Sequence, residues 1–248
     1  MNIFRDKYLA ALKAPIENRI YELVGLFNVA QSSYEVGLIY NEIGTVYRIQ
    51  GDYPKAIDSF NRALENIGDN NENLVIRMNI AETYRLNGNL VDCISILDAT
   101  KALTKENTIE YSYLLNYYGH FYLTFGDVVN ALESYESSLA ILINLKADQE
   151  KIATAMQNIG KLYLVLGEIE SALSYYNDAK LIYDNYGLSK GHHYAILLIN
   201  ESVAYNKIGN NDLAKANIDK AKKIFIDKGI VLNNDELAQF EKICEDIL

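Results

Sequence analysis

Three histidines and two cysteines are the residues of this 248-residue sequence best suited to metal binding or nucleophilic chemistry. His192 and His193 are adjacent in the segment "LSKGHHYA", which we predict to be a loop between two helices. Neighbouring side chains point apart once a helix begins, so a surface loop is favoured over a metal site. Cys93 and Cys244 are far apart in sequence and occupy positions expected to be packed, which favours inert thiols in a reducing compartment.

Motifs that carry catalysis are absent from the sequence. It contains no HExxH, P-loop, GxSxG or CxxC pattern. Carboxylates are abundant, but none of them is tied to a pocket by its spacing. Many of the 20 tyrosines recur at the repeat positions described below, which favours a packing role for them. The sequence therefore predicts a protein without enzymatic activity, cofactor or metal.

Charge and hydropathy argue against two classes of partner. The net charge is −10 and no run of Lys and Arg is present, whereas binding to nucleic acid requires clustered cations. No apolar run approaches the roughly 20 residues that cross a bilayer. The N-terminus also lacks the apolar core of a signal peptide. We therefore expect a soluble, cytoplasmic protein that does not associate with membranes.

One pattern recurs five times along the chain and must position any binding residues. An aromatic residue is followed four positions later by glycine, then by a polar residue, and then by small, large and small residues at helical spacing. The glycines lie 37, 38, 41 and 42 residues apart and are Gly51, Gly88, Gly126, Gly167 and Gly209. Glycine favours the end of a first helix, the polar residue caps a second helix, and the small residues let the two helices approach closely. A period of this size indicates an array of repeats.

These residues resemble the tetratricopeptide repeat, in which an aromatic residue, Leu-Gly and Tyr on one helix precede Ala, Phe and Ala on the next. The first-helix positions of the first and fourth copies are filled by Tyr40, Ile43, Gly44 and Tyr47, and by Met156, Ile159, Gly160 and Tyr163. Departures from the pattern in the second and fifth copies are Arg77, Cys93, Glu201 and Ser202. The resemblance implies an all-α fold, a right-handed superhelical solenoid of antiparallel helix pairs. The long period is similar to that of the kinesin light chain and the bacterial peptide-sensing subfamilies.

The resemblance extends over residues 37–230, and the two ends differ from it. We predict five repeats at 37–73, 74–111, 112–152, 153–194 and 195–230. Residues 1–36 are predicted to be helical, as a degenerate repeat or cap, with an apolar stripe at Ile16, Ile20, Leu23, Phe27 and Ala30. Residues 231–248 are predicted to form a capping helix that begins near Asn234, with an apolar face of Leu237, Phe240, Cys244 and Ile247. Solenoids need such ends because an open last repeat exposes apolar surface.

The resemblance implies that the first helices line a concave groove in which a ligand lies. Each repeat places an asparagine at the fifth or sixth position, namely Asn41, Asn79, Asn116, Asn158 and Asn200. In the related subfamilies the sixth position, matched here by Asn79, Asn158 and Asn200, holds the ligand backbone. An asparagine side chain donates and accepts hydrogen bonds, which suits an extended peptide. The alternative is that these side chains cap or bond neighbouring helices.

Other groove positions indicate the kind of peptide. The further candidate binding residues are Arg48, Arg85, His120, Lys161 and Lys207. Their four Arg and Lys side chains outnumber the two groove carboxylates, Glu42 and Glu82, in a chain that is otherwise acidic. A positive groove would attract an acidic peptide or a C-terminal carboxylate through charge-assisted hydrogen bonds. The alternative is that exposed first-helix ends simply carry scattered cations.

Three functions fit the sequence. The first is a non-enzymatic protein- or peptide-binding module, an adaptor or scaffold that holds a peptide segment in the groove. The second is a peptide-responsive regulator similar to the bacterial pheromone receptors, which carry an effector domain ahead of their repeats. Only about 36 residues precede the array here, too few for such a domain unless the chain is a fragment. The third is a self-assembling scaffold, and the oligomeric state stays open.

Overall fold

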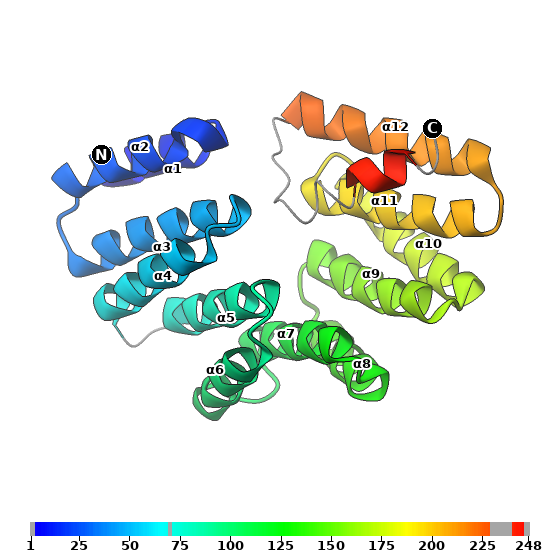
Figure 1. Cartoon of the computed structure of the whole chain (residues 1–248), viewed down its shortest axis with the longest axis horizontal. Helices are drawn as coiled ribbons and strands as arrows, with labels where there is room; N and C mark the ends of the chain where they lie inside the picture. Colours follow the sequence, from blue (N-terminus) through cyan, green and yellow to red (C-terminus); the bar gives the residue numbers. More distant parts are fainter. Residues whose placement is uncertain (1–2, 69–70, 229–239, 246–248) are drawn as a thin grey trace. The chain divides into compact units, whose positions relative to one another are not determined.

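The computed structural model describes residues 3–68, 71–228 and 240–245, and every regular element in these ranges is helical (Figure 1). The chain divides into two compact units, Met1–Lys105 and Glu106–Leu248. Antiparallel helix pairs are stacked within each unit, so the predicted all-α repeat architecture is confirmed.

The first unit begins with a short helical hairpin that precedes two helix pairs. Its helices are α1 (Ile3–Leu12), α2 (Ile16–Gly25), the 3-10 helix η1 (Leu26–Asn28), α3 (Ser33–Ile49), α4 (Tyr53–Ile67), α5 (Asn71–Leu86) and α6 (Leu90–Leu103). The α3/α4 and α5/α6 helices form the pairs, and α5 packs on α4 to stack one pair on the other.

The described residues of the second unit form three helix pairs, followed by a helical segment at 240–245. Its helices are α7 (Ile109–Phe125), α8 (Val128–Asn144), α9 (Gln149–Leu166), α10 (Ile169–Asn185), α11 (His192–Lys207) and α12 (Asn211–Lys228). Each first helix in the chain begins three or four residues before the corresponding repeat boundary expected from the sequence, for example at Ser33 rather than residue 37. These extra residues lengthen the first helices, and the repeat boundaries themselves stay predictions.

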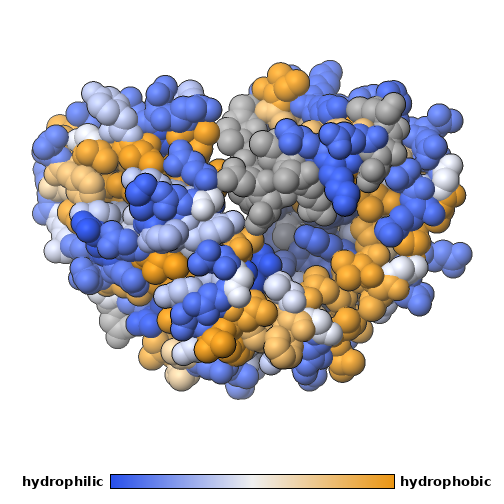
Figure 2. All heavy atoms as spheres, in the orientation of Figure 1, coloured by the Kyte–Doolittle hydropathy of each residue, from blue (hydrophilic) through white to orange (hydrophobic). Residues whose placement is uncertain are grey.

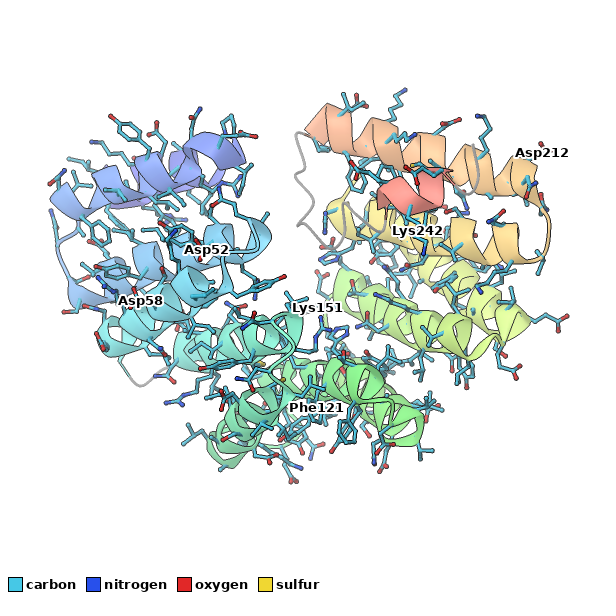
Figure 3. All side chains as sticks on the ribbon, in the orientation of Figure 1. Asp52, Asp58, Phe121, Lys151, Asp212 and Lys242 are labelled. Atoms are coloured by element: carbon cyan, nitrogen blue, oxygen red, sulfur yellow. The ribbon has the colours of Figure 1, made fainter. Side chains whose placement is uncertain are left out.

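The turns inside the pairs form as their residue types dictate. Gly167 has φ of 80° and Gly126 has φ of 90°, a left-handed conformation in which a Cβ atom would be strained. The side chain of Asp52 accepts a hydrogen bond from the Lys55 amide at the start of α4, where Figure 3 labels it. The same capping bond is made by Asn89, Asp127 and Asn210. Glu168, at the equivalent place before α10, makes no such side-chain bond.

Glycines in the middle of first helices make room for a large side chain of the second helix. A Cβ atom added to Gly160 would lie 2.6 Å from the Tyr176 ring, and one added to Gly119 would lie 2.3 Å from the Tyr135 ring. Distances this short require the ring or the helices to shift. The glycines therefore set how closely the two helices of each pair approach, which offsets their cost of about 1 kcal/mol relative to alanine in a helix.

The fifth pair replaces this packing with a buried polar cluster. Ser202 and Glu201, where Leu-Gly is expected, are both fully buried in α11. The Glu201 carboxylate accepts hydrogen bonds from Lys180 Nζ at 2.7 Å and from Asn217 Nδ2 at 2.9 Å. These bonds join α10, α11 and α12. The carboxylate of Glu201, which departs from the repeat pattern, is therefore buried together with hydrogen-bond donors, as a buried charge requires.

The two ends of the array are packed on their neighbours. The predicted N-terminal stripe lies in one apolar cluster with α1 and α3, in which Ile16 and Leu23 are buried. At the other end, residues 240–245 are helical, and Phe240 meets Phe225 of α12 at 5.8 Å between ring centroids. Ile243 is buried in the same cluster. The predicted cap residues Asn234, Leu237 and Ile247 lie outside the described residues.

Two predictions about the histidines and cysteines have different outcomes. His192 and His193 are in the first turn of α11, not in a loop, and their rings lie 5.6 Å apart rather than pointing away from each other. Gly191 takes an extended conformation and is the N-cap of this helix. It has no side chain to make a capping bond, so no capping signal in the sequence marks where the helix begins. Cys93 is buried as expected, and burial raises the pKa of its thiol to about 12.

The surface is mixed in polarity. In Figure 2, hydrophilic side chains cover much of the visible face, and apolar patches interrupt them within each unit. No helix in the described ranges combines the length and the hydropathy needed to cross a bilayer. Within the same ranges no group of three or more His, Cys, Asp or Glu side chains is placed to hold a metal ion.

Candidate functional site

Asparagines of successive first helices bond to one another. Asn79 Nδ2 of α5 donates to Asn41 Oδ1 of α3 at 3.2 Å, and Asn158 Nδ2 of α9 donates to Asn116 Oδ1 of α7 at 3.4 Å. In both cases the donor occupies the sixth position of its repeat and the acceptor the fifth position of the preceding repeat. The one-residue offset between the asparagines is therefore what lets them face each other across adjacent helices. We call each such pair a rung.

The rung of the first unit is part of a larger bonded network. Arg48 donates from Nη1 to Asn79 Oδ1 at 3.1 Å, and its guanidinium lies 5.7 Å from the centroid of the Phe60 ring. Asn41 donates in turn to Glu42 Oε1 at 3.2 Å. The Asn79 side chain thus uses both its oxygen, as an acceptor, and its nitrogen, as a donor. Only 9% of this residue is exposed.

The network continues to the N-terminal hairpin. Burial raises the pKa of Glu42, and this is partly opposed by the hydrogen bonds that the carboxyl group makes with Tyr8 and Asn41. Burial and the nearby Glu42 charge also raise the pKa of the Tyr8 hydroxyl. A polar strip therefore runs from α1 through α3 to α5 in the first unit.

Carboxylates neutralise the candidate cations of the first unit. Arg85 forms an ion pair with Glu82 one turn away on α5, at 2.7 Å, and both side chains are about four-fifths buried. Glu42 lies near Arg48, whose charge favours its ionised form. With Arg48 and Arg85 set against Glu42 and Glu82, the predicted excess of positive charge does not arise in this unit.

The second unit keeps its predicted cations without carboxylates at the equivalent positions. The fifth, sixth, ninth, twelfth and thirteenth positions of the repeats that begin with α7, α9 and α11 include Lys161 and Lys207 and no Asp or Glu. Glu201, at the seventh position of the last repeat, is fully buried. Lys207 is exposed, and Lys161 and Asn158 are half-buried. His120 Nδ1 lies 3.0 Å from the hydroxyl of Tyr135, whose ring occupies the space opposite Gly119. Among the groove positions, the excess of cations over carboxylates that the sequence shows therefore comes from the repeats of the second unit.

A further pair of amide residues in the second unit occupies the positions of a rung but is not bonded. Gln157 of α9 occupies the fifth position, as Asn41 and Asn116 do, and Asn200 of α11 occupies the sixth. Both are buried, with exposed fractions of 5% and 6%. The Oε1 atom of Gln157 nevertheless has no hydrogen-bond partner among the described residues. The sequence places Gln157 at a groove position of the fourth repeat, but we did not include it among the candidate binding residues because the fifth and sixth positions were searched for asparagine.

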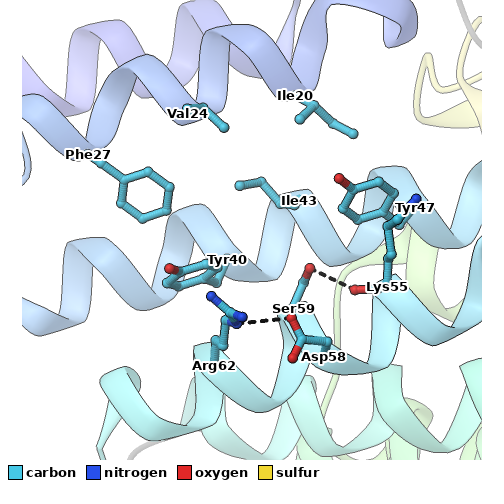
Figure 4. Close-up of a pocket in the computed structure, with 10 residues that line it drawn as sticks. All are labelled: Ile20, Val24, Phe27, Tyr40, Ile43, Tyr47, Lys55, Asp58, Ser59 and Arg62. Atoms are coloured by element: carbon cyan, nitrogen blue, oxygen red, sulfur yellow. Dashed lines mark hydrogen bonds and ion pairs between the residues drawn. The ribbon is translucent and has the colours of Figure 1, made fainter.

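A separate hollow of about 250 Å³ lies between α2, α3 and α4 in the first unit (Figure 4). Apolar side chains of α2 and η1 form one side of it. Tyr40 and Tyr47 of α3 form the floor, and α4 contributes Lys55, Ser59 and Arg62. No residue of this hollow was a predicted binding residue, and it does not include the rung asparagines.

Known proteins share this fold and part of the sequence pattern. Family models described as tetratricopeptide repeat match residues 110–185 and 38–70. A solved Rap protein complexed with competence and sporulation factor is 20% identical with a TM-score of 0.74, over 98% of this chain and 67% of that chain. BtubC from P. vanneervenii is 18% identical with a TM-score of 0.60, over 94% of this chain and 95% of that one.

Kinesin-type repeats are similar as well. A putative kinesin light chain repeat protein from Podosopora anserina is 15% identical with a TM-score of 0.56, over 77% of this chain and 94% of that one. No curated protein matches the sequence. At these identities the likeness concerns the fold, and the site must be judged from its own residues.

Proposed function

Because the chain is built of tetratricopeptide repeats, we propose that it is a non-enzymatic adaptor or scaffold whose second unit holds a peptide segment along α7, α9 and α11. The main support is that these first helices carry polar side chains at the groove positions of their repeats, including one amide rung and two cations. We call these side chains the row. The residues of the row are Asn116, His120, Asn158, Lys161 and Lys207.

The amides of this row have hydrogen-bonding capacity beyond the rung. An asparagine side chain offers two N–H groups and two acceptor lone pairs, and the Asn116–Asn158 rung uses one donor and one acceptor. That bond is long at 3.4 Å, and both residues are half-buried rather than enclosed. A peptide N–H and C=O can therefore be met without first breaking a short bond.

The spacing of the helices suits an extended ligand. Packed helices lie about 8–10 Å apart, and an extended chain advances about 3.3 Å per residue. The amide side chains of α7 and α9 would then meet the peptide backbone about three residues apart. The two lysines would favour an acidic residue or a C-terminal carboxylate in the same peptide, since ionised hydrogen bonds are the stronger ones.

Selection from a random peptide library with free C-termini tests this function. The library is panned against the wild-type protein, against Asn158→Ala, and against the control Asn177→Ala, which removes an exposed asparagine from α10. We expect the wild type and the control to enrich one common motif and Asn158→Ala to enrich it at least tenfold less. Equal enrichment by all three proteins, or no motif at all, would refute binding at the row.

The carboxylate preference has its own test. A selected peptide is synthesised with a free and with an amidated C-terminus, and both are titrated into wild type and into Lys161→Ala/Lys207→Ala. We expect amidation or loss of acidic residues to weaken binding to the wild type several-fold and to change little in the double variant. An equal loss in both proteins would place the carboxylate contact elsewhere.

A peptide-responsive regulator is the second candidate function. The Rap protein that covers 98% of this chain was crystallised with competence and sporulation factor, which makes a peptide-induced rearrangement of the two units here worth testing. Small-angle scattering with and without a selected peptide measures it. A change in radius of gyration would favour a regulator, and an unchanged value would favour a passive adaptor.

A further inference from the structure

The hollow between α2, α3 and α4 has an apolar side and a charged side. Ile20 and Val24 of α2 lie on one side of it, and the rings of Tyr40 and Tyr47 lie beneath (Figure 4). Val24 is 49% exposed, so the apolar side continues onto the surface of α2. Neither the rungs nor the cations of the second unit take part in this hollow.

In the α3/α4 pair, one small residue beside the hollow stands where the α9/α10 pair has a ring. Ser59 directly precedes Phe60, the large residue that packs against Gly44, just as Tyr175 directly precedes Tyr176, which packs against Gly160. In the α9/α10 pair, Tyr175 stacks on Tyr163 with 5.6 Å between ring centroids and 16° between their planes. That stacked ring fills the equivalent place in the second unit.

In the α3/α4 pair the corresponding tyrosine is not covered by a ring of the second helix. Tyr47 is the counterpart of Tyr163, each lying four residues before its turn glycine. The hydroxyl of Ser59 donates to the backbone carbonyl of Lys55 at 2.8 Å, so this short side chain turns back on its own helix. A guest ring over Tyr47 would make the contact that Tyr175 makes over Tyr163.

The volume limits what can occupy the hollow. Sites for drug-sized ligands measure about 300–1,000 Å³, and the volume here is about 250 Å³. One aromatic side chain matches this space better than a cofactor, and aromatic pairs are favoured in the offset or stacked geometry that Tyr47 permits. The occupant is therefore a single ring presented by another molecule.

The charges at the rim specify what lies next to that ring. Lys55 Nζ lies 5.4 Å from the centroid of Tyr47, and the Arg62 guanidinium lies 5.7 Å from the centroid of Tyr40. Asp52 pairs with Lys55 at 2.5 Å and Asp58 with Arg62 at 2.9 Å. Both pairs are exposed, and such pairs contribute little to stability, so a carboxylate of another molecule could replace Asp52 or Asp58 at little cost.

We propose that this hollow is a docking site for one aromatic side chain of a partner protein, flanked in the partner by an acidic residue that Lys55 or Arg62 receives. The two cations are held against the tyrosine rings at the edge of the hollow, so an incoming carboxylate would meet them while the ring enters. The site is independent of peptide binding by the second unit, because it shares no residue with it.

The test uses 4-hydroxyphenylacetate, which joins a phenol ring to a carboxylate, as the probe. Saturation-transfer NMR measures its binding to wild type, to Ser59→Tyr and to the control Ser174→Tyr, which adds a tyrosine at an exposed position of α10. For so small a probe we expect a Kd of about 1–10 mM. Wild type and the control should bind it saturably, and Ser59→Tyr should bind it at least tenfold more weakly because its own ring fills the hollow.

Two further measurements keep the result unambiguous. Val24→Trp fills the hollow from the exposed face of α2 and should also abolish binding, which matters if Ser59→Tyr does not fold by circular dichroism. Binding of 4-methylphenol, which has the ring without the carboxylate, should be several-fold weaker than that of 4-hydroxyphenylacetate. Absence of saturable binding, or binding retained by Val24→Trp, would overturn the docking site, and equal affinity for both probes would overturn the acidic flank.

Discussion

The first helices of the two units carry asparagine at the same positions of their repeats and use it differently. In the first unit Asn79 is nearly enclosed, bonded to Asn41 on one side and to Arg48 on the other. In the second unit the Asn116–Asn158 rung is longer and half-buried, and the adjacent Gln157–Asn200 position has no rung. The same residue type therefore makes an enclosed network between two helices in one unit and a longer, half-buried bond in the other, where we propose that a peptide binds.

Removal of the enclosed amide should have the largest effect on stability. Asn79→Ala deletes the donor to Asn41 and the acceptor of Arg48, which leaves both partners without these bonds in a half-buried environment. We expect a loss of about 2 kcal/mol in the free energy of unfolding. Urea denaturation measures it, with the exposed Asn87→Ala as control. A loss no greater than that of the control would show that the network is not a brace.

Replacement of the unbonded acceptor should have the opposite sign. Gln157→Leu removes the buried Oε1 atom that has no partner while roughly keeping the side-chain volume. Because a buried polar group without a hydrogen bond is unfavourable, we expect stability to stay the same or to rise by up to about 1 kcal/mol. The equivalent change Asn41→Leu, which breaks a formed rung, should destabilise. If Gln157→Leu destabilises as much as Asn41→Leu, the Gln157–Asn200 pair is bonded in solution.

The smallest effect concerns the pH dependence that Glu42 adds to the first unit. Burial raises the pKa of this carboxyl group above its ordinary value of 4.5. The folded state then holds the proton to higher pH than the unfolded state, so this group's contribution to stability falls as pH rises from 4.5 through the raised pKa. Denaturation midpoints of wild type and Glu42→Gln should therefore diverge with rising pH, with the wild type falling. Denaturation midpoints of the two proteins that change in parallel with pH would contradict the contribution of Glu42.

Local sequence signals were sufficient for the helices and their turns. Gly167 and Asp127 act as the turn glycine and the capping residue that their types predict, because these roles depend on bonds within a few residues. The close packing of Gly160 on Tyr176 also followed from the repeat spacing. Such features need only the order of residues along one helix pair.

Features that depend on the register between pairs could not be predicted. Which amide bonds which is set by how α5 stacks on α3 and α9 on α7, and the sequence shows only that the asparagines are one residue out of line. Likewise, the sequence shows Ser59 only as a small residue of a second helix. That it lines a hollow depends on how α2 packs against α3. The burial of Glu201 depends on Lys180 and Asn217 from two other helices, and neither lies near it in the sequence.

Titration of one selected peptide into two matched double variants tests whether the peptide binds at the second unit and not at the first. Asn116→Ala/Asn158→Ala removes the rung of the second unit, and Asn41→Ala/Asn79→Ala removes the rung of the first. We expect Asn116→Ala/Asn158→Ala to raise the Kd at least tenfold. We expect Asn41→Ala/Asn79→Ala, measured under conditions in which it is folded, to change the Kd by less than about threefold. An unchanged Kd in Asn116→Ala/Asn158→Ala, or a larger loss in Asn41→Ala/Asn79→Ala, would contradict it.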